Sequence, residues 1–192
     1  MTSYKCTSEN RLETFPNSPL DIPRELADNK PIRFRAKAGR FMDYKYNSIN
    51  ELNHFDFAEA AVGDIQMADN MFHMVIDNVK ILPENSFNRD IRTMRTNEML
   101  FKIEGAEVIS VVEEGYREYD ADGNLKKKIE DATITPDKYK DVADALLEGV
   151  IYELKLEGGV YAFVIDGNNE RTYEIKVAGS GDSESWNLFL NV

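Results

Sequence analysis

Cysteine and histidine are nearly missing from this 192-residue chain, which has one cysteine and two histidines. The single cysteine, Cys6, excludes an intramolecular disulfide and a thiolate metal cluster within one chain. His54 and His73 leave little material for a nucleophile-base-acid triad or a histidine-rich metal site. We therefore predict no catalytic residue, no metal site and no cofactor, and we expect that the protein is not an enzyme.

Long hydrophobic runs are also missing. The first residues lack the apolar stretch of a signal peptide, and no later segment approaches the roughly 18 apolar residues that a membrane helix needs. We expect a cytoplasmic protein that makes no contact with membranes.

Positive charge is scarce outside the N-terminal part of the chain. The net charge is −12, yet residues 1–50 hold 9 Lys and Arg against 6 Asp and Glu, whereas residues 51–192 hold 14 against 29. An acidic body repels nucleic acid phosphates and anionic lipids, so neither is a suitable partner. The negative charge has two possible roles: it keeps the protein soluble, or it binds a basic protein partner. The basic N-terminal part could also dock on the acidic body of its own chain.

The composition is that of one folded domain with an N-terminal extension. Hydrophobic residues make up 42% and charged residues 30% of the chain, and this length usually forms a single core. Residues 1–30 contain three prolines and no sustained period, which indicates an irregular arm. Residues 32–38 alternate apolar and cationic side chains as a strand does, and Gly39 should end it. We predict that residues 1–50 pack as an arm and first strand on a β domain of residues 51–192.

Alternating hydrophobicity dominates the rest of the chain and predicts antiparallel strands joined by short turns. In the segment 71–82 the apolar residues change parity near Asp77 and Asn78, which predicts a bulge that redirects the strand. Residues 40–53 read as a connection with a short helical turn. The predicted pairs are a hairpin of 57–67 with 71–82, a hairpin of 107–119 with 125–129, and a three-stranded meander of 150–156, 160–165 and 173–177.

Two segments have helical rather than alternating spacing. Thr135 and Pro136 form a helix start, and apolar residues at spacings of three and four follow, so we predict a helix over about 136–147. A second helix is predicted over about 183–191, where Trp186, Phe189 and Leu190 form an apolar stripe and the indole fills the core. With about eight to ten strands, the fold class is mainly β: an antiparallel bent sheet, barrel or sandwich with two helices.

Arg89, Arg92 and Arg95 recur every third residue within an acidic region and form the candidate binding site. On a helical turn the three guanidinium groups would share one side and could hold a phosphate or carboxylate. The alternative is a loop fixed by salt bridges to nearby acidic strands. His73, by contrast, reads as a hydrogen-bonded sheet residue, and residues 120–124 read as a hairpin turn because they do not fit an EF-hand calcium loop.

These patterns favour a non-enzymatic binding protein that presents an acidic surface to a protein partner, which charge suggests is basic. An immunity protein that covers a basic toxin would be one form, by analogy of charge alone. Two alternatives stay open: a binder of small anions that uses the arginine loop, and a hydrolase that uses only carboxylates. The sequence does not decide between a monomer and a homodimer.

Overall fold

The computed structural model describes residues 32–35, 41–68 and 70–192, with side chains from residue 43 onward. The described residues belong to one compact unit. Strand β1 (Ile32–Arg35) confirms the first part of the predicted strand 32–38. The predicted arm of residues 1–30, the rest of that strand with Gly39, and Cys6 lie outside the described residues.

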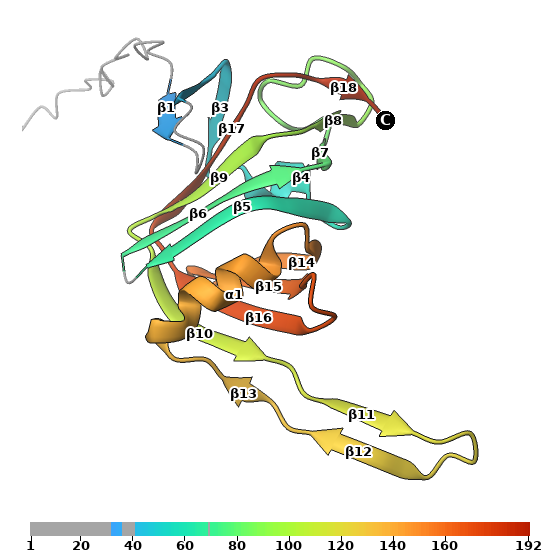
Figure 1. Cartoon of the computed structure of the whole chain (residues 1–192). Helices are drawn as coiled ribbons and strands as arrows, with labels where there is room; N and C mark the ends of the chain where they lie inside the picture. The colour runs from blue at the N-terminus through green and yellow to red at the C-terminus, as the bar shows by residue number, and fades with distance from the viewer. Residues whose placement is uncertain (1–31, 36–40, 69) are drawn as a thin grey trace, which may run out of the picture. The chain divides into compact units, whose positions relative to one another are not determined.

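Ten antiparallel strands form the main sheet (Figure 1), which confirms the predicted fold class. Their order across the sheet is β13-β10-β16-β15-β14-β5-β6-β9-β17-β3. Both predicted hairpins and the meander are present. The bounds are β3 (Tyr46–Ile49), β5 (Ala60–Ala68), β6 (Met71–Asp77), β9 (Met99–Glu104), β10 (Glu107–Glu113), β13 (Ala132–Thr133), β14 (Val150–Glu157), β15 (Val160–Asp166), β16 (Thr172–Ala178) and β17 (Gly181–Trp186).

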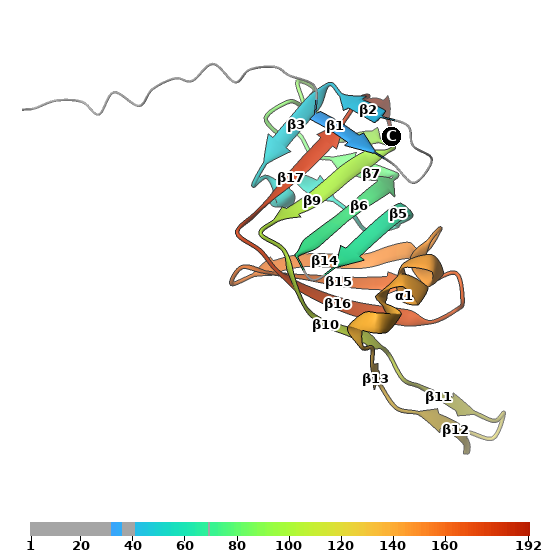
Figure 2. The same cartoon turned by 60° about the vertical axis from the view of Figure 1, so that its left-hand side comes forward.

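The main sheet bends sharply in its middle, between β14 and β5. These two strands pair only where Ala60 and Ala61 meet Ile151 and Val150, so the sheet divides there into two halves (Figure 2). Side chains from the two halves meet in the core: the ring centroids of Phe72 on β6 and Phe163 on β15 are 4.9 Å apart. The sheet is not a closed barrel, because the outermost strands β13 and β3 do not pair with each other.

Smaller sheets complete the described chain. Asn78, with φ of +63°, follows the last residue of β6, and the chain leaves the main sheet there. The chain changes direction where predicted, but at the end of a strand and not at a bulge, since the register shift of the β5–β6 pair lies between Val62 and Asp64. The small sheets are the pair β1 with β2 (Phe41–Tyr44), the pair β11 (Tyr116–Tyr119) with β12 (Leu125–Ile129), and a four-stranded sheet of β18 (Leu190–Asn191), β8 (Met94–Thr96), β7 (Val79–Ile81) and β4 (Phe55–Asp56).

The predicted first helix is confirmed. It begins as a 3-10 turn η2 (Pro136–Lys138) and continues as α1 (Tyr139–Leu146). Tyr139, Val142 and Leu146 are buried, so one face of α1 packs on the body beside β5.

The second predicted helix is wrong, because residues 183–191 lie mostly in the strands β17 and β18. β17 lies between β9 and β3 and pairs with both, and this backbone pairing overrides a local spacing that also fits a helix. Trp186 nevertheless fills the core as predicted, with no exposed surface. The segment 40–53 also differs from its prediction, since it contains β2 and β3 before the 3-10 turn η1 (Leu52–His54).

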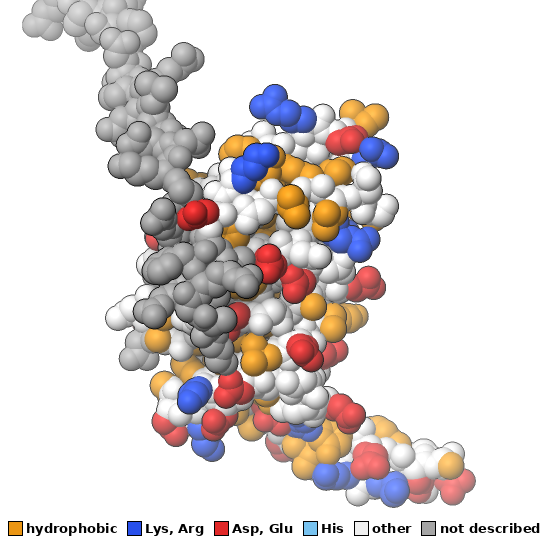
Figure 3. All heavy atoms as spheres, turned by 45° about the horizontal axis from the view of Figure 1, so that its top comes forward, with side chains coloured by type: hydrophobic (Ala, Val, Ile, Leu, Met, Phe, Trp, Pro, Cys, Tyr) orange, Lys and Arg blue, Asp and Glu red, His pale blue; other side chains and the backbone are white. Residues whose placement is uncertain are grey.

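The pair β11–β12 projects from the body as a two-stranded arm (Figures 1 and 2). Every residue of both strands is exposed. Hydrophobic, basic and acidic side chains all lie along it in the space-filling view (Figure 3). We call residues 116–129 the β11–β12 arm.

Candidate functional site

The outer edge of β5 changes from paired to open along its length. Near its start, the Val62 amide donates to the Gly149 carbonyl, and the Val62 carbonyl accepts from the Glu148 amide. The register then shifts between Val62 and Asp64, and beyond this bulge no strand of the described chain pairs with residues 64–68 on the side away from β6. The Ile65 amide donates instead to Asp64 Oδ1 at 3.1 Å. Residues 64–68 therefore form an open sheet edge, which can pair with another chain.

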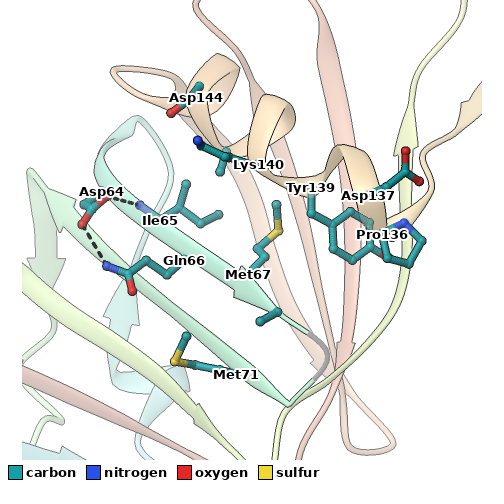
Figure 4. A pocket seen from close by; sticks show the side chains of 12 residues that line it. Asp64, Ile65, Gln66, Met67, Met71, Pro136, Asp137, Tyr139, Lys140 and Asp144 are labelled. Atoms are coloured by element: carbon teal, nitrogen blue, oxygen red, sulfur yellow. Dashed lines mark hydrogen bonds between the residues drawn. The ribbon is translucent and has the colours of Figure 1, made fainter. Parts of the chain in front are cut away.

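A groove of about 720 Å³ separates this open edge from the helix (Figure 4). Its helical wall uses positions three or four residues apart, which lie on one side of the η2–α1 segment. The other wall is β5 itself with the start of β6. The lining residues are Asp64, Ile65, Gln66, Met67, Ala68, Met71, Pro136, Asp137, Tyr139, Lys140, Ala143 and Asp144.

The groove combines an apolar interior with an acidic rim. Ile65 and Tyr139 are buried, and Met67 is partly buried and packs against the core. Three carboxylates, Asp64, Asp137 and Asp144, line the groove against one cation, Lys140. A hydrogen bond from Thr135 holds the pKa of Asp137 below its usual value, so this carboxylate is charged at neutral pH.

This geometry suits an extended peptide. Residues 64–68 span about 16 Å at about 3.3 Å per residue, which offers pairing for a strand of similar length. Peptides that add a strand to a sheet edge gain affinity from main-chain hydrogen bonds and specificity from pockets for alternate side chains. The carboxylates at the rim are complementary to positive charge.

Two further cavities are smaller and lie elsewhere. One of about 530 Å³ separates residues 52–58 from residues 152–157 of β14. The other, of about 440 Å³, lies at the root of the β11–β12 arm and is lined by residues 114–116 and 169–172. Neither borders the open edge of β5.

The three arginines of the predicted anion site lie on two kinds of element. Arg89 and Arg92 are exposed in the loop between β7 and β8, which forms no helical turn, and Arg95 is half-buried on β8. Arg92 Nη2 lies 3.0 Å from Asp90 Oδ2, an ion pair within the loop itself and not with a neighbouring acidic strand. None of the three lines the cavities described above. Anion binding by this loop stays a prediction.

A pair of buried carboxyl groups, Asp182 and Glu184, lies on the core face of β17 and was not foreseen from the sequence. Tyr161 Oη donates to Asp182 Oδ2 at 2.8 Å, and Ser48 Oγ donates to Glu184 Oε2 at 2.9 Å. Burial, together with a hydrogen bond and charge repulsion from Asp182, raises the pKa of Glu184 to about 9. The pair lines none of the three cavities described above.

The other polar residues considered in the sequence, His73 and the turn of residues 120–124, lie in a strand and a hairpin turn. His73 is buried on β6 opposite Gln66 and Lys102, and burial followed by the charge of Lys102 lowers its pKa. Asp120 Oδ1 accepts from the amides of Asp122 and Asn124, as expected for a hairpin turn. Among the described residues, no group of three or more His, Cys, Asp or Glu side chains could hold a metal ion. That part of the chain also has no helix long and apolar enough to cross a membrane.

No protein-family model matches this chain, and no curated protein or solved structure is significantly similar to it. The candidate site is therefore assigned from geometry alone. Sequence reasoning found both walls of the groove, as a strand and a helix, but not their juxtaposition. A signal was present in the acidic residues Asp137 and Asp144, which recur on the side of the helix next to its buried stripe.

Proposed function

We propose that this protein is a binding protein that takes up an extended, basic segment of a partner protein between β5 and α1. The observation that carries this proposal is the open edge of β5 at residues 64–68, which faces the η2–α1 segment across the groove. The added segment continues the main sheet by one strand. This function agrees with the basic protein partner that the charge of the sequence favours.

The strand edge, the apolar interior and the acidic rim of the groove have separate roles in this proposal. The edge of β5 supplies main-chain hydrogen bonds, which recognise an extended backbone of any sequence. The apolar interior takes alternate side chains, and the rim carboxylates contact cationic side chains that point outward. Rim charges mainly raise the association rate and make it sensitive to salt.

The test is fluorescence anisotropy with a labelled peptide of alternating Lys and Val. Asp137 is exposed, so Asp137→Lys should leave the fold intact while it weakens binding by roughly three- to tenfold, because one attractive pair becomes repulsive. Glu84→Lys, an identical charge change at an exposed residue outside the groove, is the matched control and should leave the affinity unchanged.

A second peptide tests strand addition itself. The same sequence with N-methyl groups on alternate residues cannot donate main-chain hydrogen bonds along one edge, so its binding should be lost. The proposal fails if the N-methylated peptide binds as well as the parent, or if Glu84→Lys weakens binding as much as Asp137→Lys.

A further inference from the structure

The β11–β12 arm exposes large apolar side chains to solvent. Its four large apolar side chains are exposed by 37% to 53%, and they form the cross-strand pairs Tyr116 with Ile129 and Tyr119 with Leu125. A two-stranded ribbon that packs on the body only at its root is at best marginally stable in water. The arm therefore has the properties of an element that is completed by a partner.

The charges of the arm indicate the chemistry of that partner. Arg117 lies directly opposite Lys128, and like charges in this position repel each other. Lys126, Lys127 and Lys128 are consecutive in β12. Lys127 lies opposite Glu118 and Lys128 pairs with Glu130, so part of this charge is balanced within the chain. Residues 116–129 still hold four Lys and Arg against three Asp and Glu, and carboxylates of an acidic surface would offset the remaining positive charge of β12.

The contacts at its root hold the arm in position. The Gly115 amide donates to Asp131 Oδ1 at 2.8 Å. The guanidinium carbon of Arg171 lies 4.7 Å from the Tyr116 ring centroid, while Arg171 Nε donates to Glu113 Oε1 at 2.7 Å. A hairpin fixed at its root loses less freedom on docking than a disordered segment.

We infer that β12 of one copy adds to the open edge of β5 in a second copy of this chain. This inference rests on the proposed function of the groove and names an occupant for it. β12 has five residues, two apolar ends and three lysines, and the open edge of β5 offers residues 64–68 beside three carboxylates. The outer edge of β12 pairs with no other strand of the described chain, so both edges that would join are open.

The arm points away from its own body in both ribbon views (Figures 1 and 2), which makes a second copy the natural source of the strand. Two copies related by a two-fold axis can exchange arms reciprocally. Each groove is then filled by the other copy, and the assembly closes as a dimer instead of growing into a filament.

Sedimentation velocity on complementary charge variants of the full chain tests this inference. The wild type should be a dimer that dissociates as salt is raised. One variant carries K126E/K127E/K128E and the other carries D64K/D137K. Each should be monomeric alone, because arm and groove then have like charges. Their equimolar mixture should form a dimer, because both arm-to-groove contacts become attractive again.

The same variants separate this inference from the proposed function. The K126E/K127E/K128E variant retains its groove and should bind the Lys-Val peptide. A monomeric wild type whose groove binds the peptide would overturn the arm exchange and leave the proposed function standing. A dimer that survives D64K/D137K, or a mixture that stays monomeric, would place the arm elsewhere and also overturn it. A wild type that neither forms a dimer nor binds the peptide would overturn both proposals.

Discussion

The hydroxyl group of Tyr161 on β15 donates a 2.8 Å hydrogen bond to Asp182 Oδ2 on β17. These strands belong to opposite halves of the bent sheet, with four strands between them in the sheet order. Both residues are almost fully buried, at 1% exposure each. This hydrogen bond thus joins the two halves through the core, and burial, followed by the hydrogen bond to Asp182, raises the pKa of the Tyr161 hydroxyl above its usual value.

Removal of this contact should destabilise the fold. In Tyr161→Phe, Asp182 Oδ2 loses the hydroxyl that donates to it, and an unsatisfied buried acceptor costs about 1–3 kcal/mol of unfolding free energy. Urea denaturation followed by the fluorescence of Trp186, the single tryptophan, measures this loss. Tyr152→Phe is the control, since Tyr152 is 75% exposed on the neighbouring strand and its variant should behave as wild type. Equal stability of both variants would contradict the structural role of the hydrogen bond.

The stability of the protein should fall as pH rises through neutrality. The pKa of Glu184 is raised from 4.5 to about 9 in the folded state, so between these values the folded protein retains a proton that the unfolded chain has lost. Stability from this group is complete below about pH 4.5 and is lost progressively up to about pH 9. The slope is at most about 1.4 kcal/mol per pH unit.

Glu184→Gln isolates this effect. A glutamine can still accept from Ser48 and donate to Asp182, yet it has no proton to lose. Urea denaturation from pH 5 to pH 9 should therefore give a flatter profile than wild type, with the variant more stable at the alkaline end. Parallel profiles for the two proteins would show that Glu184 does not titrate between the folded and unfolded states as described.

Trp186 should be among the most costly residues to truncate. It is fully buried, and Trp186→Ala should lower the unfolding free energy by about 3–5 kcal/mol, as measured by circular dichroism. Leu188→Ala, at a side chain that is 62% exposed, should have little effect. A small loss of unfolding free energy in Trp186→Ala would mean that the aromatic rings around Trp186 are loosely packed. Rings with centroids 5.6 to 5.8 Å from Trp186 belong to Tyr46, Phe55, Phe87 and Phe189.

Gly115 should control the direction of the β11–β12 arm. A Cβ atom there would lie 2.2 Å from the Ile129 carbonyl oxygen, so Gly115→Ala must push the two strands apart at the root. We expect weaker dimerisation in sedimentation with little change in the thermal unfolding of the body. Gly123→Ala is a comparison at the arm tip, where a Cβ meets no atom within 4 Å, although its φ of +83° adds local strain. If the Gly115→Ala variant is fully dimeric, the direction of the arm does not control dimerisation.

The local elements were largely predictable because their signals are local. Strands and turns follow from alternation and from turn residues, and the helix after Thr135 follows from its start signal and apolar spacing. The segment 183–191 failed because its apolar residues fit two periods. Asp182, Glu184 and Trp186 share the core face of a strand, and two buried carboxyl groups beside a tryptophan do not resemble a core pattern.

By itself, the sequence determined the fold class, most of the strands, the helix after Thr135 and the acidic character of the body, since each depends on neighbours in the chain or on composition. Only the tertiary structure decided where the sheet bends, which edge of β5 stays open and that α1 lies beside that edge. It also brought Tyr161 to Asp182. The physical reason is that these relationships join residues distant in the chain, and they arise from how the two halves of the sheet bury their apolar faces against each other.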